Sequence, residues 1–229
     1  MLGIINMEIK MHSSKDRAVY MHIPFCNKIC SYCDFCKFYY NENWADNYLI
    51  ALEKEINEKY LNDNIKSIYF GGGSPSSLNT NELKKLFKII KKFKVNKDAE
   101  ITFEFNLNEI TEEKLKILKD NNVNRLSIGI QSFNEKILKF LNREGSYKIA
   151  KEKIDLCKKM GFNNINIDLM YAIPNQSILS LKKDLRLIKK LKVNHVSTYS
   201  LIIEDGTILS NENTQPIDEK KDLKMYKPL

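Results

Sequence analysis

The 229-residue sequence contains no run of 18 or more apolar residues, so we expect no membrane-spanning helix. Its N-terminus, residues 1–17, is polar and has no apolar centre of the kind found in signal peptides, so we expect a cytoplasmic protein. No low-complexity linker divides the chain. Its length therefore suits one large domain or a single α/β barrel better than two independent domains.

The charge balance is basic, with 37 Lys and Arg against 29 Asp and Glu and a formal net charge of +8. A basic excess is one sign of a nucleic-acid partner. Here the lysines fall in pairs on the expected outward faces of helices, such as Lys84-Lys85 and Lys158-Lys159, and glutamates lie between them. This pattern is typical of solvated helix surfaces, so we do not expect a nucleic-acid partner.

Five cysteines are present, and four of them lie between residues 26 and 36. An odd number of cysteines in one tight cluster argues against a disulfide framework and favours a metal or cluster site. Cys26, Cys30 and Cys33 have the spacing C-x3-C-x2-C and directly follow the first expected strand. Three thiolates can hold three irons of an oxygen-sensitive [4Fe–4S] cluster, which leaves the fourth iron open to chelate S-adenosylmethionine (SAM).

Zinc is the alternative reading of the same cysteines. With Cys36 as a fourth thiolate, the segment has the donor number of a tetrahedral zinc site. Zinc sites, however, normally combine two cysteine pairs separated by a longer stretch. The compact spacing favours the cluster with Cys36 as a non-ligand, because a fourth cysteine ligand would block the open iron. Cys157 has helical spacing with apolar neighbours and is expected in the core.

Strand-like and helix-like segments alternate along the chain, and Thr111 and Gly161 are expected to begin and end helices. The expected strands are 18–24, 65–70, 100–105, 125–131, 164–171 and 195–201. The expected helices are 42–60, 80–93, 111–121, 134–141, 147–160 and 177–191. Six such repeats predict an α/β fold, an incomplete and open (β/α)6 barrel of the TIM type, because a closed barrel usually needs about 250 residues.

The predicted strands and helices divide the chain into three parts. Residues 1–17 form an N-terminal segment, residues 18–207 form the barrel domain, and residues 208–229 form a polar C-terminal tail with a frayed end. The cysteine loop follows a barrel strand, which is where barrel active sites lie.

Further candidate site residues lie at the ends of later strands. The run Phe70-Gly-Gly-Gly-Ser-Pro75 follows the second expected strand, and its backbone can come close to a ligand. Glu104 ends the polar face of its strand, and a carboxylate pointing into a barrel needs a partner or a cation. Asp168 lies at another strand end, where it can accept from ribose hydroxyls.

The motif Tyr20-x-His-Ile-Pro-Phe-Cys26-x3-Cys30-x-Tyr32-Cys33-Asp-Phe resembles the radical SAM family that contains oxygen-independent coproporphyrinogen III oxidase and the haem chaperone HemW. The resemblance runs from Tyr20 to Thr207 and includes Arg125-Leu-Ser-Ile-Gly-Ile-Gln131 and Asp168-Leu-Met-Tyr-Ala-Ile-Pro174. It implies that Cys26, Cys30 and Cys33 ligate the cluster.

The resemblance also implies a set of SAM contacts. Gly72, Gly73 and Ser74 approach the methionyl amino group, Glu104 binds the cofactor, Gln131 lies near the adenosine and Arg143 lies near the SAM carboxylate. The remaining implied SAM contacts are Tyr20, Tyr32 and Asp168. The chain departs from the family pattern at Arg143-Glu144-Gly145, where an Arg-x-His pair is usual, and at Ala172 and Asn175, where glycines are usual.

Three hypotheses for function remain open at this stage. The first is a HemW-like haem chaperone, with the cluster, SAM and haem as ligands, an electron donor such as flavodoxin or ferredoxin, and a haem-accepting protein as partner. The second is a coproporphyrinogen III oxidase. The third is a truncated, non-catalytic cluster-binding barrel, because family members continue after the sixth strand into a C-terminal domain.

Two features resemble the haem chaperones more than the oxidases and therefore favour the first hypothesis over the second. Tyr20 comes early in the chain, and Cys36 lies three residues after Cys33 instead of two.

Overall fold

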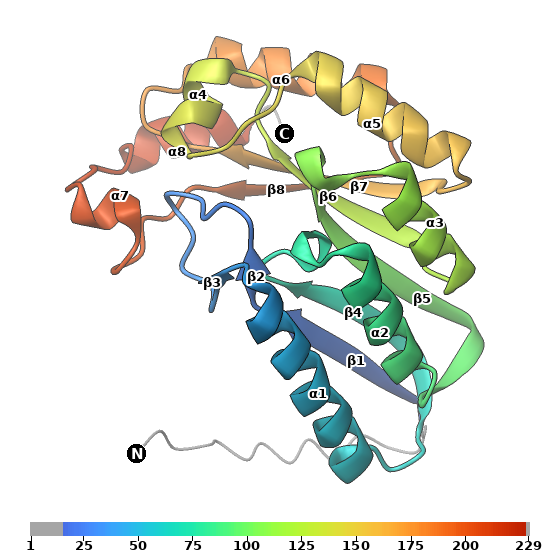
Figure 1. Cartoon of the computed structure of the whole chain (residues 1–229). Helices are drawn as coiled ribbons and strands as arrows, with labels where there is room; N and C mark the ends of the chain where they lie inside the picture. The colour runs from blue at the N-terminus through green and yellow to red at the C-terminus, as the bar shows by residue number, and fades with distance from the viewer. Residues whose placement is uncertain (1–15, 228–229) are drawn as a thin grey trace.

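The structure, a computed structural model, describes residues 16–227. Most of the expected N-terminal segment, residues 1–15, and the last two residues of the expected tail lie outside the described residues. Six parallel strands form one curved sheet in the order β1-β4-β5-β6-β7-β8 (Figure 1). They are β1 (Asp16–Ile23), β4 (Asn64–Gly72), β5 (Lys94–Asn106), β6 (Arg125–Gln131), β7 (Asn164–Tyr171) and β8 (His195–Ser200). The predicted open (β/α)6 half-barrel is confirmed.

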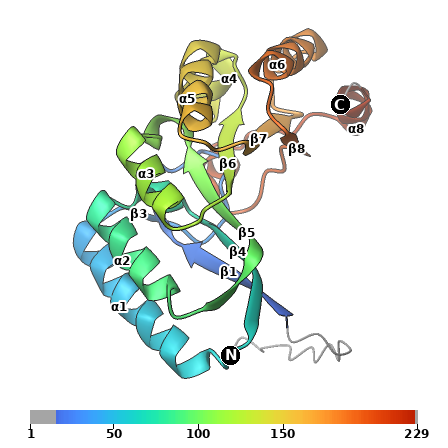
Figure 2. The same ribbon diagram turned by 90° about the vertical axis from the view of Figure 1, so that its right-hand side faces the viewer.

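Helices connect consecutive strands and follow one another along one side of the sheet, so that the other side stays free of them (Figure 2). They are α1 (Glu42–Lys59), α2 (Thr80–Ile90), α3 (Glu112–Asp120), α4 (Glu135–Phe140), α5 (Tyr147–Lys159) and α6 (Ile178–Leu191). Within residues 16–227, no helix is long and apolar enough to cross a membrane.

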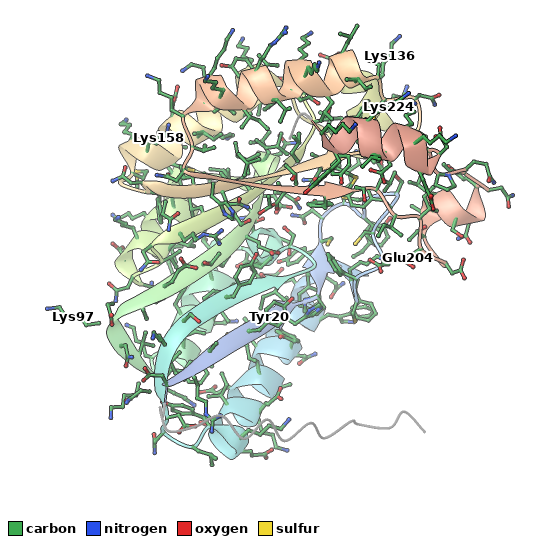
Figure 3. The ribbon with its side chains drawn as sticks, turned by 180° about the vertical axis from the view of Figure 1, so that it is seen from behind. Tyr20, Lys97, Lys136, Lys158, Glu204 and Lys224 are labelled. Atoms are coloured by element: carbon green, nitrogen blue, oxygen red, sulfur yellow. The ribbon has the colours of Figure 1, made fainter. Side chains whose placement is uncertain are left out.

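Strand alternation separates the core from the free face of the sheet, because successive side chains in a strand point to opposite sides. Phe70 of β4, Phe103 of β5 and Ile128 of β6 are fully buried in the core that the helices cover. Tyr69, Thr102, Glu104 and Ser127, which lie next to them in sequence, are polar and point to the free face. Figure 3, which views the molecule from the side opposite to that of Figure 1, shows the free face with Tyr20 on it and Lys97 pointing away from the molecule.

Local sequence signals explain the helix ends. The Thr111 hydroxyl accepts a hydrogen bond from the backbone N–H of Lys114 at 3.2 Å, as expected of an N-cap. Gly161 follows α5 with φ +84°, the left-handed conformation that glycine adopts most readily. Both predicted helix boundaries are confirmed.

Three parts of the fold differ from the expectation. Strand β5 begins at Lys94, six residues before the expected start. Two short paired strands, β2 (Phe25–Cys26) and β3 (Phe38–Tyr39), enclose the cysteine loop. The C-terminal tail forms α7 (Ile208–Asn211) and, within the stretch 211–229 that is expected to fray, α8 (Glu219–Tyr226). Helix α8 is ordered because Met225 is fully buried and the helix packs on α6 and β7.

Candidate functional site

A cavity of about 540 Å³ opens at the C-terminal ends of the strands, next to the cysteine loop. Its lining includes every residue that the sequence predicted for the site except Tyr20. These residues are Cys26, Cys30, Tyr32, Cys33, Gly72, Gly73, Ser74, Glu104, Gln131, Arg143 and Asp168. Tyr20 lies beside the cavity on β1, where its ring stacks on that of Tyr69 at 6.1 Å and its exposed fraction is 59%.

The cysteine loop is anchored at its middle by Ser31. The backbone N–H of Ser31 donates to the carbonyl of Leu141 at 3.2 Å, and its hydroxyl donates to the carbonyl of Phe140 at 2.8 Å. The carbonyl of Ser31 accepts from the N–H of Leu209 at 3.0 Å. The end of α4 and the start of α7 therefore hold the part of the loop between the second and third cysteines.

The three cysteines of the predicted cluster site line the same cavity. Burial, followed by the charges of Cys33 and Cys30, raises the pKa of Cys26 to about 12. Burial also raises the pKa of Cys33. Nη1 of Arg143 lies 3.2 Å from Sγ of Cys30. Thiols protonated in this way must lose their protons on binding iron, and the fixed positive charge of Arg143 favours the thiolate.

A single zinc ion and a [4Fe–4S] cluster place different demands on the positions of the cysteine sulfurs. Within residues 16–227, no three His, Cys, Asp or Glu side chains converge as a single metal ion requires. Each cysteine of a [4Fe–4S] site binds a different iron, so its sulfurs need not meet at one point. Cys36 is exposed and does not line the cavity, and its carbonyl lies 2.8 Å from Nε2 of His22. Its expected role as a non-ligand stays a prediction.

The glycine run packs closely against the strand that leads into the cysteine loop. A Cβ atom on Gly73 would lie 2.9 Å from the carbonyl oxygen of Phe25. Gly72 has φ +114°, and a Cβ atom there would lie 2.7 Å from Nδ1 of His22. Glycine is therefore required at both positions for this loop to form one wall of the cavity.

The carboxyl groups of Glu104 on β5 and Asp168 on β7 both line the cavity. The hydroxyl of Tyr69 donates to Oε1 of Glu104 at 2.6 Å. Burial, together with the charge of Asp168, raises the pKa of Glu104 to about 7. Burial also raises the pKa of Asp168, although Nδ2 of Asn166 donates to its Oδ1 at 2.8 Å. Two carboxyl groups in this setting are suited to a cationic or hydroxyl-bearing ligand.

Gln131 occupies a strained position at the end of β6. Its φ is +69°, which is unusual for a residue with a side chain, and only 3% of it is exposed. The hydroxyl of Tyr199 on β8 donates to its Oε1 at 2.7 Å. This bond joins two strands across the cavity and fixes the direction of the glutamine amide.

Sequence reasoning missed a hub at Glu109. One carboxylate oxygen accepts from Nδ2 of Asn27 at 2.8 Å, and the other accepts from the hydroxyls of Ser74, at 3.1 Å, and Ser76. Nδ2 of Asn106 donates to the Ser74 hydroxyl at 2.9 Å. The hub connects the cysteine loop to the glycine run. Strand periodicity gives no signal for it, because Glu109 lies in the short 3₁₀ turn after β5.

The two departures from family glycines keep the backbone conformation that glycine would adopt. Ala172 has φ +58° and Asn175 has φ +66°. Asparagine tolerates this left-handed region better than alanine does. The substitutions therefore leave the turn after β7 in place and add strain, mainly at Ala172.

A six-stranded parallel half-barrel with three cysteines clustered above its strand ends is the architecture of radical SAM proteins. The sequence profile of the Radical SAM superfamily matches residues 20–197. The chain belongs to this superfamily.

Two curated relatives and one solved structure indicate which members it is similar to. The chain is 40% identical over 200 residues to the heme chaperone HemW of Bacillus subtilis, covering 85% of this chain and 53% of the relative. It is 32% identical over 197 residues to the oxygen-independent coproporphyrinogen III oxidase of Escherichia coli, covering 84% and 43%. The chain thus spans about half the length of the curated relatives it matches.

The solved structure is that of coproporphyrinogen III oxidase (HemN) from Escherichia coli, a radical SAM enzyme. It superposes with a TM-score of 0.86 at 28% identity and covers 94% of this chain and 52% of that one. The similarity therefore extends over almost all of the present chain.

Proposed function

We propose that the chain holds a [4Fe–4S] cluster through Cys26, Cys30 and Cys33 and binds SAM in the adjoining cavity. The observation that carries this proposal is that three cysteines, two carboxyl groups and one guanidinium, from segments far apart in the sequence, line one cavity of about 540 Å³. Membership of the radical SAM superfamily supports the same two cofactors.

The polar groups of the cavity suit the parts of SAM. Arg143 can bind the carboxylate of the methionyl moiety, since guanidinium is a fixed cation with several donors. Asp168 can accept from ribose hydroxyls, and Glu104 can face the cationic amino end near the glycine run. Gln131 and Tyr199 form the wall where the adenine would lie. Tyr20 and Tyr32 complete the proposed set, Tyr20 through its stacking on Tyr69.

When bound, the cluster supplies the electron that cleaves SAM reductively. The protein residues orient SAM, exclude water and hold charge. An external electron donor such as flavodoxin or ferredoxin is required for this reaction. The five cysteines are free thiols, which suits the reducing cytoplasm where we propose the protein works.

We further propose that the chain acts as a HemW-like haem chaperone, with haem as a ligand and a haem-accepting protein as partner. Its identity to the Bacillus subtilis heme chaperone is 40%, against 32% for the Escherichia coli oxidase. The spacing of Cys36 after Cys33 supports the same choice.

Anaerobic reconstitution with iron and sulfide, followed by reduction in the presence of SAM, tests the core of the proposal. We expect about four irons per chain and formation of 5′-deoxyadenosine. If the chain takes up no iron, or never forms 5′-deoxyadenosine, the proposal that it binds a cluster and cleaves SAM is wrong.

Titration of the reconstituted chain with haem tests the finer assignment. We expect a change in the haem absorption spectrum that saturates with added protein. An unchanged haem spectrum, combined with decarboxylation of coproporphyrinogen III, would favour the oxidase instead.

A further inference from the structure

The cysteine loop is closed at its neck by the paired strands β2 and β3. The N–H of Phe38 donates to the carbonyl of Pro24 at 2.7 Å, and the N–H of Tyr40 donates to the carbonyl of Cys26 at 2.9 Å. The first cysteine therefore belongs to the neck itself. A shift of the Tyr40 backbone would strain its hydrogen bond to Cys26.

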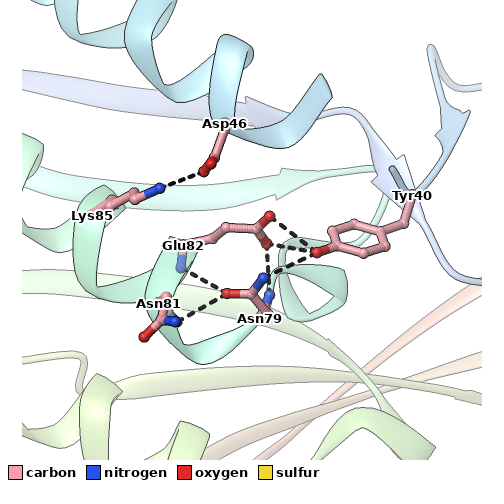
Figure 4. Close-up of polar contacts among 6 residues, drawn as sticks. All are labelled: Tyr40, Asp46, Asn79, Asn81, Glu82 and Lys85. Carbon is pink, nitrogen blue, oxygen red and sulfur yellow. Dashed lines mark hydrogen bonds and ion pairs between the residues drawn. The ribbon is translucent and has the colours of Figure 1, made fainter. Parts of the chain in front are cut away.

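A buried carboxylate holds the side chain of Tyr40. The phenol hydroxyl lies 3.0 and 3.2 Å from the two carboxylate oxygens of Glu82, to which it donates, and it accepts from Nδ2 of Asn79 at 3.2 Å. Glu82 is only 1% exposed. Figure 4 shows these three side chains converging between the end of the cysteine loop and the first turn of α2.

The burial of Glu82 exceeds what its helix requires. The carboxylate also accepts from the N–H of Asn79 at 2.7 Å, which completes a capping box at the start of α2. A glutamate can play that capping role while its side chain remains in water. Burial instead raises the pKa of Glu82, an unfavourable effect that the hydrogen bonds from Asn79 and Tyr40 offset only in part.

A neighbouring surface pair provides a contrast. Nζ of Lys85 on α2 lies 2.6 Å from Oδ1 of Asp46 on α1, and this ion pair joins the two helices (Figure 4). Both partners are more than 40% exposed, so the pair contributes little to holding the two helices together. The Tyr40–Glu82 contact is shielded from solvent on its carboxylate side and directly connects the loop to α2.

Helix α2 is a suitable anchor because it begins just after the glycine run. The N–H of Ser74 donates to the carbonyl of Phe25 at 2.8 Å, and the hydroxyl of Ser77 donates to the same carbonyl at 3.1 Å. These bonds hold β2, where the chain enters the cysteine loop, against residues 74–77. The Tyr40–Glu82 contact holds the residue after β3, where the chain leaves the loop, against the start of α2, which follows directly.

We propose that Tyr40 and Glu82 are positioning residues that hold the neck of the cysteine loop, and with it Cys26, against the N-terminus of α2. The inference rests on the proposed function, because its consequence is a cluster site kept in one geometry. Neither residue lines the proposed cofactor cavity, so both act through the backbone of the loop.

The test compares wild-type protein with Tyr40→Phe, Glu82→Gln and the control Tyr60→Phe. Tyr60 lies at the other end of α1 and makes similar bonds: its hydroxyl donates to the carbonyl of Asp63 at 2.7 Å and accepts from the N–H of Lys94 at 2.8 Å. All four proteins are reconstituted anaerobically. The measurements are the rate of iron loss to a ferrous chelator and the electron paramagnetic resonance spectrum of the reduced cluster.

We expect Tyr40→Phe to lose iron roughly tenfold faster than wild type, because a hydrogen bond to a charged acceptor is removed. Its spectrum should broaden as the site adopts several geometries. The rate of iron loss in Glu82→Gln should lie between those of wild type and Tyr40→Phe, since the amide oxygen of the glutamine still accepts a hydrogen bond from Tyr40. Wild-type rates of iron loss in Tyr40→Phe, or equally fast loss in Tyr60→Phe, would overturn the proposal.

Hydrogen–deuterium exchange on the iron-free proteins separates this inference from the proposed function. Tyr40→Phe should raise exchange in residues 24–40 and leave the C-terminal half of α1 unchanged. If wild-type protein binds no iron, the proposed function fails while this measurement still decides the positioning role. Unchanged exchange in residues 24–40 would refute that role.

Discussion

Nη1 of Arg143 lies 3.2 Å from Sγ of Cys30, so the guanidinium proposed to bind SAM also contacts a proposed cluster ligand. The same side chain donates through Nη2 to Oδ1 of Asn106 at 3.0 Å and to the carbonyl of Gly129 at 2.7 Å. These two acceptors hold the guanidinium in one plane between β5 and β6. A single residue thus links the geometry of the sheet to the cysteine loop.

Replacing Arg143 by lysine tests this link. Lysine keeps the positive charge but cannot make the three bonds together, so we expect SAM affinity to fall at least tenfold. We also expect a lower reduction potential of the cluster, because hydrogen bonds to its sulfurs are among the factors that set this potential. Redox titration of the reconstituted protein measures the shift, with Lys28→Ala as a control at the cavity rim. An unaltered potential would show that the Arg143–Cys30 contact is lost in the loaded protein.

Glu104 couples stability to pH. Its folded pKa of about 7 lies above the ordinary value of 4.5, so the folded state retains a proton that the unfolded chain has lost. The resulting destabilisation is absent below pH 4.5, grows between pH 4.5 and 7, and is complete above pH 7. Glu104→Gln should therefore stabilise the cofactor-free protein at pH 8, by up to about 3 kcal/mol before screening by water in the cavity.

Denaturant unfolding at pH 8 and pH 5 measures this effect, which should be smaller at pH 5. The same variant should bind SAM more weakly, since the cationic ligand loses its carboxylate partner. Equal stabilisation at both pH values would contradict the assignment of the raised pKa to Glu104.

The glycine run offers a steric test. In Gly73→Ala the new Cβ would lie 2.9 Å from backbone atoms of Phe25 and Pro24, which cannot move aside as a side chain can. We expect loss of measurable SAM binding and poor cluster retention. Gly145→Ala is the matched control, because its Cβ would meet only the side chain of Leu107 at 3.4 Å and that of Leu138 at 3.7 Å. Normal iron content and SAM binding in Gly73→Ala would show that the loop is more adaptable than its packing indicates.

The elements that could be predicted from the sequence are those with a strong local period or a dense motif. The six strands, Thr111 as an N-cap and the open half-barrel belong to this group. Helix α8 could not be predicted, because Met225 is its only fully buried residue and its apolar stripe is weak. The neck strands β2 and β3 are too short for any periodicity to reveal them.

The predicted site residues converge on one cavity because parallel strands place their C-terminal ends at one edge. Their polar partners were not predictable in the same way. The Tyr40–Glu82 bond joins residues 42 positions apart, and the Asn27–Glu109 bond joins residues 82 positions apart. Such pairs depend on how loops fold over the strand ends, and neither composition nor spacing specifies which polar side chains meet.

The turn after β7 gives a prediction for stability alone. Ala172 has φ +58°, and a left-handed backbone costs a non-glycine residue roughly 1–2 kcal/mol. Ala172→Gly removes this strain but adds freedom to the unfolded chain, so we expect a net stabilisation of about 0.5–1 kcal/mol. Asn175→Gly, at φ +66°, should change stability by only a few tenths of a kcal/mol, because asparagine tolerates the left-handed region.

Ala150→Gly is the control for these two substitutions. Ala150 lies inside α5 and is fully buried, so glycine there should destabilise the protein by about 1 kcal/mol. Thermal unfolding of the three variants gives the comparison directly. The expected order of stability is Ala172→Gly above Asn175→Gly, and both above Ala150→Gly. A destabilised Ala172→Gly would mean that contacts of the methyl group of Ala172, a residue that is 2% exposed, outweigh the backbone strain.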